Sequence, residues 1–260
     1  MSEFREYLVS AADAIGIRLR PDEVDLFCTY KELLIERNKL MNLTSIKDDL
    51  EIAIKHFTDS LTCLLVAERA EFDSVIDIGT GAGFPGLVLK IMAPSSSAVL
   101  VDSVGKKVNF VRDTASALGL DGVAAIHGRA EELGRNAEYR GQFALAVSRG
   151  VASLPALCEY CLPFVRKGGI FIAMKGPKAA EEIDAGARAA AILGGGRPEI
   201  TRLTLPYGAG ERMLVVITKE QATPNGYPRK TGAPEKQPLG LRVQRPEKSP
   251  SSSPSNRPLG

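Results

Sequence analysis

The spacing of hydrophobic residues changes near residue 74. Before that point, apolar residues recur at helical intervals, first over residues 4–15 and then over residues 24–34. The second stretch follows Pro21-Asp22, which is a suitable helix start. The alternation typical of a half-buried strand does not occur here. The sequence therefore predicts an N-terminal helical extension over residues 1–70.

From residue 74 onward, short apolar runs alternate with helical patterns. The expected strands are 74–78, 98–102, 123–127, 143–147 and 170–174, and the expected helices are 87–92, 106–118 and 154–165. This alternation is typical of a parallel sheet with helices on both faces. Residues 200–205 and 212–219 flank a turn-like Pro-Tyr-Gly-Ala-Gly segment, and this arrangement predicts an antiparallel hairpin. The expected fold is α/β, mostly parallel, and ends in that hairpin.

Beyond residue 222 the chain becomes rich in Pro, Ser, Gly and Lys, and this segment holds 8 of the 16 prolines. Proline cannot donate to a helix or a sheet ladder, so little regular structure is expected. We therefore divide the chain into the helical extension, a core over 71–220 and a largely disordered basic tail over 221–260. The end, 249–260, is expected to be disordered throughout.

Composition points to an ordinary globular protein. Hydrophobic residues make up 44% and charged residues 25% of the chain, and no run of ~18 apolar residues predicts a membrane span. The N-terminus begins with charged residues and lacks an apolar signal core, so we expect a cytoplasmic protein. Cys158 and Cys161 form a lone Cys-x-x-Cys within an amphipathic helical pattern, which favours packed, reduced cysteines and no metal.

Net charge is only +2, but it is unevenly distributed. Residues 220–260 carry seven basic and three acidic side chains, a net +4, which leaves −2 for residues 1–219. A polyanionic partner is compatible with this asymmetry, although whole-chain charge is weak evidence for one.

The candidate chemistry centres on a glycine loop after the first predicted strand, over residues 77–86. Glycines there permit a sharp turn and close approach of a ligand to the backbone. Gly81, Gly83 and Gly86 fit the dinucleotide fingerprint, with Asp102 near the place of its ribose-binding acid. That match leaves out Asp77 and Gly79.

S-adenosylmethionine suits the whole loop better than a dinucleotide does. Asp77 can attract the amino group of this zwitterion, and Asp102 can bind its ribose hydroxyls. The cofactor has no pyrophosphate, so a phosphate-binding helix start is not required. After the third strand, Ala130-Glu131 can line an adenine pocket, although a polar helix start explains these residues equally well.

Short motifs along the chain, in a fixed order, carry a resemblance to a known family. They are 38–44 (Asn-Lys-Leu-Met-Asn-Leu-Thr), 55–60 (Lys-His-Phe-Thr-Asp-Ser), 77–86, 101–103, Lys106-Lys107, Ser148-Arg149, Lys175-Gly176 and 210–212. Together they make the chain resemble the bacterial 16S rRNA guanine-N7 methyltransferases (RsmG), long called glucose-inhibited division protein B. Gly150 stands where members often carry Ala, and the tail after about Gly240 exceeds the usual length.

The resemblance implies a Rossmann-like fold that uses S-adenosylmethionine and modifies a guanine in the decoding-region loop of small-subunit rRNA. It also implies that Gly79, Phe84, Ala130-Glu131 and Arg149 bind the methyl donor. The partner is then 16S rRNA or the small ribosomal subunit, and nothing in the sequence demands more than a monomer. An NAD(P)-dependent oxidoreductase and a nonenzymatic ribosome-binding factor are the alternatives.

Guanine N7 holds an in-plane lone pair and no proton, so it can attack the sulfonium methyl without a general base. We therefore expect no catalytic base, with Arg149 as a positioning residue beside donor and target base; a salt bridge is its alternative role. His56 either contacts the substrate or is hydrogen-bonded within the core. The candidate phosphate contacts are Lys39, Lys55, Lys106, Lys107, Lys175 and Arg212. Lys106-Lys107 could equally be a solvated helix face.

Overall fold

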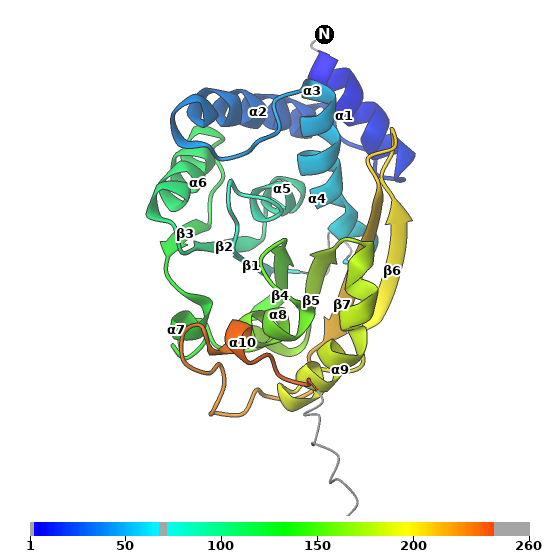
Figure 1. Cartoon of the computed structure of the whole chain (residues 1–260). Coiled ribbons are helices and arrows are strands. Elements are labelled where there is room, and N and C mark those ends of the chain that lie inside the picture. The colour runs from blue at the N-terminus through cyan, green and yellow to red at the C-terminus, as the bar shows by residue number, and fades with distance from the viewer. Residues whose placement is uncertain (1–2, 68–71, 242–260) are drawn as a thin grey trace, which may run out of the picture.

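Seven strands form one mixed sheet in the computed structural model, which describes residues 3–67 and 72–241 (Figure 1). The order across the sheet is β3-β2-β1-β4-β5-β7-β6. Strands β3 to β5 in this order pair in parallel, and β7 pairs antiparallel with β5 and β6. The predicted α/β fold with a terminal hairpin is thus confirmed. The strands are β1 (Ser74–Ile78), β2 (Ser97–Asp102), β3 (Val123–His127), β4 (Phe143–Arg149), β5 (Val165–Lys175), β6 (Glu199–Thr204) and β7 (Glu211–Thr218).

Each central strand feeds two hydrophobic cores, because successive side chains point to opposite faces of a sheet. Val75 of β1 packs in the core under α5 (Gly86–Met92) and α6 (Gly105–Ala117). Its neighbour Ile76 packs in the opposite core with α7 (Ala130–Leu133), α8 (Leu154–Cys161) and α9 (Ile183–Ile192). Burial on both faces explains why the central strands are continuous apolar runs.

The N-terminal helices share the first of these cores. Phe4, Phe27 and Phe57 are buried there, and the Phe57 ring makes edge-on contacts with the other two at centroid distances of 5.3 and 5.4 Å. The extension is therefore packed onto the sheet. Its elements are α1 (Glu3–Ala14), α2 (Pro21–Met41), α3 (Asp49–Ile52), the π-helix η1 (Ala53–Thr58), α4 (Asp59–Leu61) and the 3₁₀-helix η2 (Thr62–Leu65).

The junction before β5 differs from the sequence-based prediction of a helix to residue 165. Helix α8 ends at Cys161, and β5 begins at Val165, five residues earlier than expected. Pro163 between them cannot continue the helical hydrogen-bond ladder. Gly168 has φ +81° and lies where the pairing of β5 with β4 shifts in register. The first residues of β5 are therefore irregular, and the apolar run over 170–174 follows them.

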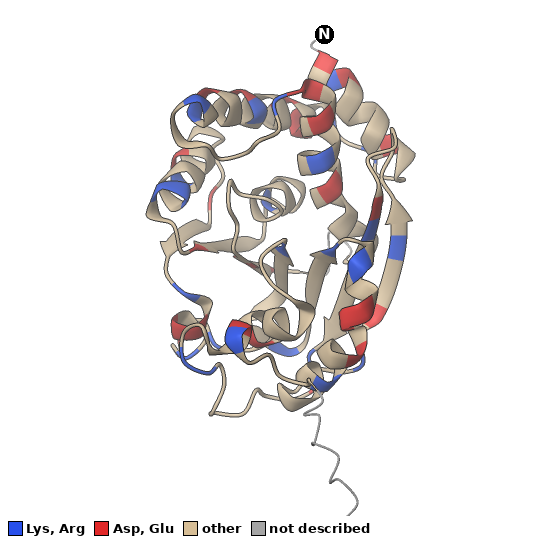
Figure 2. Ribbon diagram, viewed as in Figure 1, with Lys and Arg blue, Asp and Glu red and all other residues tan. Residues whose placement is uncertain are grey.

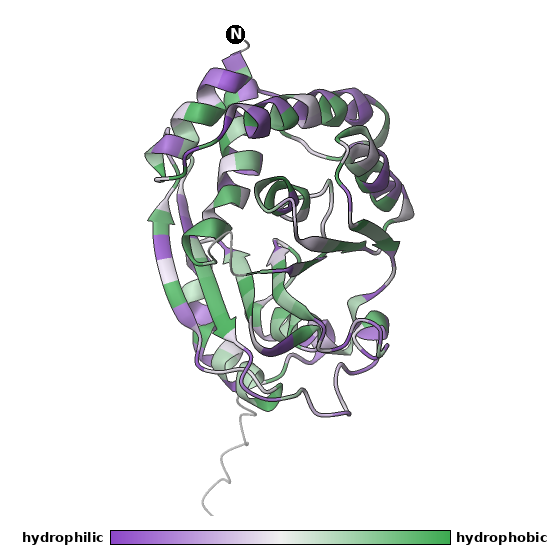
Figure 3. Ribbon diagram, turned by 180° about the vertical axis from the view of Figure 1, so that it is seen from behind, coloured by the Kyte–Doolittle hydropathy of each residue, from purple (hydrophilic) through white to green (hydrophobic). Residues whose placement is uncertain are grey.

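At one edge of the sheet, β6 is mostly polar, with Ile200 and Leu203 as its apolar residues, whereas β7 beside it is mostly hydrophobic (Figure 3). The 3₁₀-helix η3 (Pro177–Glu182) follows β5.

No helix within residues 3–67 and 72–241 is long and apolar enough to cross a membrane. Cys158 and Cys161 are buried in the α8 core.

Residues 221–241, here called the C-terminal strap, pass close to α7 and α8 (Figure 1). The short helix α10 (Ala233–Lys236) is their regular element. Arg140 donates hydrogen bonds to the carbonyl oxygens of Thr223, Pro224 and Tyr227 at 2.7–3.1 Å. The strap thus has fixed contacts with the core despite its proline content. The expectation of disorder over 249–260 falls outside the described residues.

Candidate active site

The glycine loop crosses the carboxyl end of β1. Gly79, Gly81 and Gly83 have φ of +75°, +61° and +93°, which favours glycine over residues with a side chain. The Gly79 N–H donates to Val101 O of the neighbouring strand at 2.9 Å, and a Cβ on Gly79 would lie 2.4 Å from Val151. The loop is therefore shaped so that its backbone can approach a ligand closely.

Two adjoining cavities open beside this loop. The first, of about 100 Å³, lies toward β3 and α7; the second, of about 390 Å³, lies toward the N-terminal helices. Both are lined by Gly79, Asp102, Ser103 and Val151. A ligand that spans the two would pass across the loop and the end of β2.

Asp102 is the acid between the cavities. One carboxylate oxygen accepts from Gly81 N and the other from Val104 N, both at 2.9 Å. The side chain is buried, yet each oxygen keeps a second lone pair. Asp102 thus holds the loop in place and can also accept hydroxyl donors, which fits the ribose of a nucleoside.

Asp77 has a different position from that expected for a cofactor contact. It shares the α5 side of β1 with Val75 and lines neither cavity. Its Oδ2 accepts from Gly86 N at 2.9 Å, and a Cβ on Gly86 would lie 2.8 Å from that oxygen. Burial raises the pKa of Asp77 to about 6. The geometry makes Asp77 a support beneath the loop.

Ala130 and Glu131 line the first cavity, as predicted from the motif after β3. Glu131 is buried, and its Oε1 accepts a hydrogen bond from Gly232 N of the C-terminal strap at 2.8 Å. Tyr160 and Glu235 also line this cavity. The strap residues here were not among the predicted site residues, because only the fold brings them beside α7.

An aromatic stack forms the wall of the second cavity. The Phe84 ring lies parallel to Tyr30 on one side and to His56 on the other, at centroid distances of 5.0 and 4.9 Å. Tyr30 donates a hydrogen bond to Ala82 O at 2.5 Å. Phe84 is buried, and both Phe84 and His56 line the cavity. The stack therefore fixes the glycine loop against the N-terminal helices.

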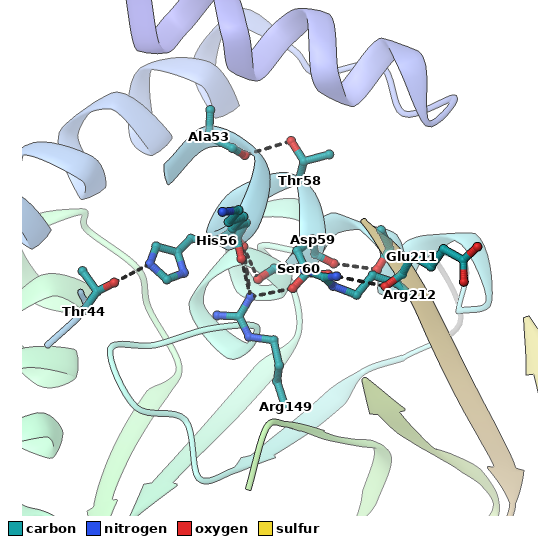
Figure 4. A network of polar contacts seen from close by, with 11 residues as sticks. Thr44, Ala53, His56, Thr58, Asp59, Ser60, Arg149, Glu211 and Arg212 are labelled. Carbon is teal, nitrogen blue, oxygen red and sulfur yellow. Dashed lines mark hydrogen bonds and ion pairs between the residues drawn. The ribbon is translucent and has the colours of Figure 1, made fainter. Parts of the chain in front are cut away.

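His56 is held within this wall by η1. Its Nε2 lies 2.8 Å from Thr44 Oγ1, and its buried Nδ1 has no hydrogen-bond partner among the described residues (Figure 4). Burial, with a smaller effect of nearby Arg149, lowers the pKa of His56 to about 3. The ring is therefore neutral near pH 7. It contributes both a core contact and a cavity surface, so both roles considered from the sequence are compatible with its position.

Two arginines meet at one buried carboxylate. Arg149 at the end of β4 lies 3.1 Å from Asp59 Oδ2, and Arg212 of β7 lies 2.9 Å from Asp59 Oδ1 (Figure 4). Arg149 also donates to Lys55 O at 3.1 Å and lies 5.4 Å from the Phe84 ring centroid. Asp59 is only 4% exposed. It belongs to the 55–60 motif but was missed as a site residue, since its partners are 90 and 153 residues away.

The lysine candidates separate into two groups. Lys107 lines the second cavity and Lys106 is exposed beside it on α6; Lys39 lines another cavity, of about 710 Å³, which also includes Thr44. Figure 2 shows basic residues on both α2 and α6. In contrast, Lys55 pairs with Glu51, and Lys175 binds Ala152 O at 2.8 Å and Glu182 at 3.0 Å. These internal contacts argue against Lys175 as a free phosphate ligand.

The two adjoining cavities suit a ligand that has a nucleoside at one end and a different polar group at the other. Glu131 and Glu235 line the first cavity only, Arg149, Phe84 and His56 line the second only, and Asp102 lines both. The N–H and C=O groups of the glycine loop lie between them. This chemistry fits S-adenosylmethionine, with Asp102 and Glu131 toward ribose and adenine and the sulfonium near the loop. The described residues contain no group of three or more side chains suited to binding a metal ion.

Comparisons with known proteins agree with this assignment. A profile of the family described as "GidB: rRNA small subunit methyltransferase G" matches residues 23–206. A ribosomal RNA small subunit methyltransferase G from Moorella thermoacetica is 48% identical over 86% of this chain and 93% of its own length. The protein of that name from Pelotomaculum thermopropionicum is 46% identical over 92% of this chain and 100% of its own length.

Solved structures support the fold. An O-methyltransferase from Bacillus cereus, in complex with S-adenosylhomocysteine, superposes with a TM-score of 0.57 at 16% identity, and the match covers 83% of this chain and 100% of that one. A SAM-dependent O-methyltransferase from Thermotoga maritima gives 0.52 at 17% identity over 74% and 72% of the two chains. The sheet is thus shared with proteins of distant sequence.

Proposed function

Because this chain belongs to the rRNA small subunit methyltransferase G family, we propose that it methylates N7 of a guanine in the decoding-region loop of 16S rRNA. It is a methyltransferase whose methyl donor is S-adenosylmethionine. The observation that carries the proposal is the pair of adjoining cavities that share Gly79 and Asp102. Together they offer one continuous path from an adenosine end to a substrate end.

The cofactor supplies an electrophilic methyl group on sulfur. In the proposal, Asp102 accepts the ribose hydroxyls, Glu131 faces the adenine, and the backbone of Gly79 and Gly81 lies along the methionine part. Asp77 acts only through the loop, by accepting the Gly86 N–H. Such a rigid loop would fix the direction of the methyl carbon, and orientation of this kind can lower a barrier by several kcal/mol, within the ~7–11 kcal/mol available from proximity.

The substrate end needs no general base, because guanine N7 attacks through a lone pair that carries no proton. His56 fits this chemistry as a neutral contact, since its low pKa removes it from proton exchange near pH 7. In the proposal, the Arg149 guanidinium beside Phe84 faces the carbonyl oxygen of the guanine. Phe84 and His56 line the cavity in which the guanine is proposed to lie.

RNA is proposed to approach over the basic side of the second cavity. Lys106, Lys107 and Lys39 are the candidates for contact with phosphates. A guanine in A-form helix is inaccessible through the deep major groove, so the target base must be exposed in a loop. Binding of 16S rRNA or the small subunit by a monomer in the cytoplasm completes the proposal.

Mass mapping of small-subunit rRNA from cells with and without this gene tests the function. One guanine should carry an added methyl group at N7 only when the gene is present. Calorimetry with S-adenosylhomocysteine and with NAD separates the methyltransferase from an oxidoreductase. Methyl transfer onto isolated small subunits separates it from a nonenzymatic ribosome-binding factor, which would bind the subunit and leave every base unchanged.

A further inference from the structure

The C-terminal strap is attached to the core by buried polar contacts. Arg229 donates to both carboxylate oxygens of Glu159 on α8, at 2.6–3.0 Å, and its own backbone N–H adds a further bond at 2.7 Å. Glu159 is fully buried. Charge-assisted bonds in a fork of this kind fix geometry strongly. The strap is thus held at one defined place on α8.

Other contacts hold the start of the strap and its end. Lys219 is buried and donates to Leu162 O, Leu193 O and Thr223 Oγ1. Near the end, Arg188 donates to Gly240 O at 2.6 Å. With both ends and the middle attached, residues 229–236 have a fixed path beside the first cavity.

On that path, the strap supplies two groups at the cavity. The Gly232 N–H donates to Glu131 Oε1, which occupies one oxygen of the carboxylate and leaves Oε2. Glu235, on α10, lines the cavity with Glu131 and Tyr160 and is exposed. Pro234, which lies between Gly232 and Glu235 in the chain, is buried. These positions place Glu235 at the outer rim of the cavity.

We infer that residues 229–236 form the outer wall of the adenosine pocket, with the Gly232 N–H positioning Glu131 and the Glu235 carboxylate accepting a donor of the adenosine. This inference rests on the proposed function, which places the adenosine in the first cavity. The family profile ends at residue 206, so the strap lies outside it. Adenosine offers an exocyclic amino group and ribose hydroxyls as donors, for which a carboxylate is a suitable acceptor.

Glu235→Gln in the full chain tests the rim contact, with calorimetric titration of S-adenosylhomocysteine and of adenosine. The amide keeps the size of the side chain but loses its charge. We expect the dissociation constants of both ligands to rise by the same factor, about 3- to 10-fold, as for the net contribution of one typical hydrogen bond at an exposed rim. Lys236→Gln, its exposed neighbour, is the matched control and should leave both constants unchanged.

Arg229→Gln combined with Glu159→Gln tests the attachment, because it removes both charges of the buried pair together. We expect weaker binding of both ligands, and faster amide exchange over residues 229–236. In the unaltered chain, S-adenosylhomocysteine should slow exchange in that segment. If the double variant does not fold, Glu235→Gln and the exchange experiment on the unaltered chain still decide.

The outcomes separate the two proposals. An unaltered chain that binds neither S-adenosylhomocysteine nor adenosine overturns the proposed function. An unaltered chain that binds both, with no ligand effect on exchange over 229–236 and with Glu235→Gln equal to Lys236→Gln, overturns the role of the strap alone. A loss for S-adenosylhomocysteine but not for adenosine also contradicts it, because the contact would then lie at the methionine end.

Discussion

The two ends of the site hold their charges by different means. At the proposed adenosine end, Asp102 and Glu131 accept backbone N–H groups from the glycine loop, from Val104 at the start of α6 and from the strap. At the substrate end, Asp59 is satisfied by two arginine side chains from β4 and β7. Backbone donors are present whatever the side chains are, whereas an ion pair fails when one partner changes. The substrate end should therefore be the more sensitive to single substitutions.

Asp59→Asn is expected to have the largest effect. The buried carboxylate pairs with Arg149 and Arg212, and breaking such a pair leaves uncompensated charge at a cost of about 3–5 kcal/mol. We expect lower unfolding free energy of that order, together with a loss of methyl transfer of at least ~100-fold. Denaturant titration and a methyl-transfer assay measure the two. Asp25→Asn, at an exposed pair with Arg5, is the control and should change stability by less than about 1 kcal/mol. Equal effects would contradict the comparison.

Asp102→Asn should have the next largest effect, and it should appear in cofactor binding. The amide nitrogen cannot accept the N–H that one oxygen accepts now, and the charge opposite the ribose is lost. Loss of about 1.5–3 kcal/mol corresponds to a rise of roughly 10- to 100-fold in the dissociation constant of S-adenosylhomocysteine. The control is Asp113→Asn on α6, where Asp113 forms an exposed ion pair with Arg37 of α2. A change confined to RNA affinity would contradict the assignment of Asp102 to the adenosine end and would place it at the substrate end.

The third prediction concerns stability against pH. His56, with a folded pKa of about 3 and an unfolded value near ~6.5, contributes stability that is complete above pH ~6.5 and is lost as pH falls toward 3. Asp77, raised to about 6 from ~3.9, contributes in the opposite direction, since its stabilisation is complete below pH ~4 and is lost as pH rises toward 6. Between pH 4 and 6 the two trends oppose one another.

Single substitutions should separate these trends. His56→Asn should become less stable as pH rises from 4 to 6, and Asp77→Asn should become more stable, each with a slope of up to ~1.4 kcal/mol per pH unit relative to the unaltered chain. Thermal unfolding across that range measures both. His127→Asn replaces the second histidine, which is exposed and bonded to Ser103 O, and is the control. Turnover should show no acid-side loss near pH 6.5 that depends on His56.

The smallest effects are expected for lysines around the substrate end. Lys107→Gln should reduce the slope of log affinity for RNA against log salt by about 1, as expected for one phosphate contact. Lys175→Gln is the control, because its ammonium group already pairs with Glu182. Binding at two or more salt concentrations gives the slopes. Equal slopes for Lys107→Gln and the unaltered chain would remove this lysine from the RNA path.

The sequence pattern was a good guide to the sheet, and it drew attention to two of the carboxylates that line the first cavity. Runs of apolar residues predicted the central strands, because burial on both faces demands continuous hydrophobicity. The exposed edge strand β6 has no such run, and its prediction depended on the turn that follows it. Asp102 at the end of β2 and Glu131 shortly after β3 were singled out because the carboxyl ends of parallel strands meet at one edge of a sheet. Asp77 was also noticed there, but strand alternation turns it under the loop, a distinction that depended on which face each helix covers.

What only the tertiary structure decided are contacts between segments far apart in the chain. Spacing within a motif carries no information on partners 90 or more residues away, so Asp59 could not be matched with Arg149 and Arg212. Likewise, the proline content of the C-terminal strap describes what its backbone cannot do, and the fixed path past Glu131 comes from side chains of the core. The local sequence pattern determines which segments are buried and which backbone groups are hydrogen-bonded within an element. Pairing of charges far apart in the sequence depends on which elements pack against each other in the folded protein.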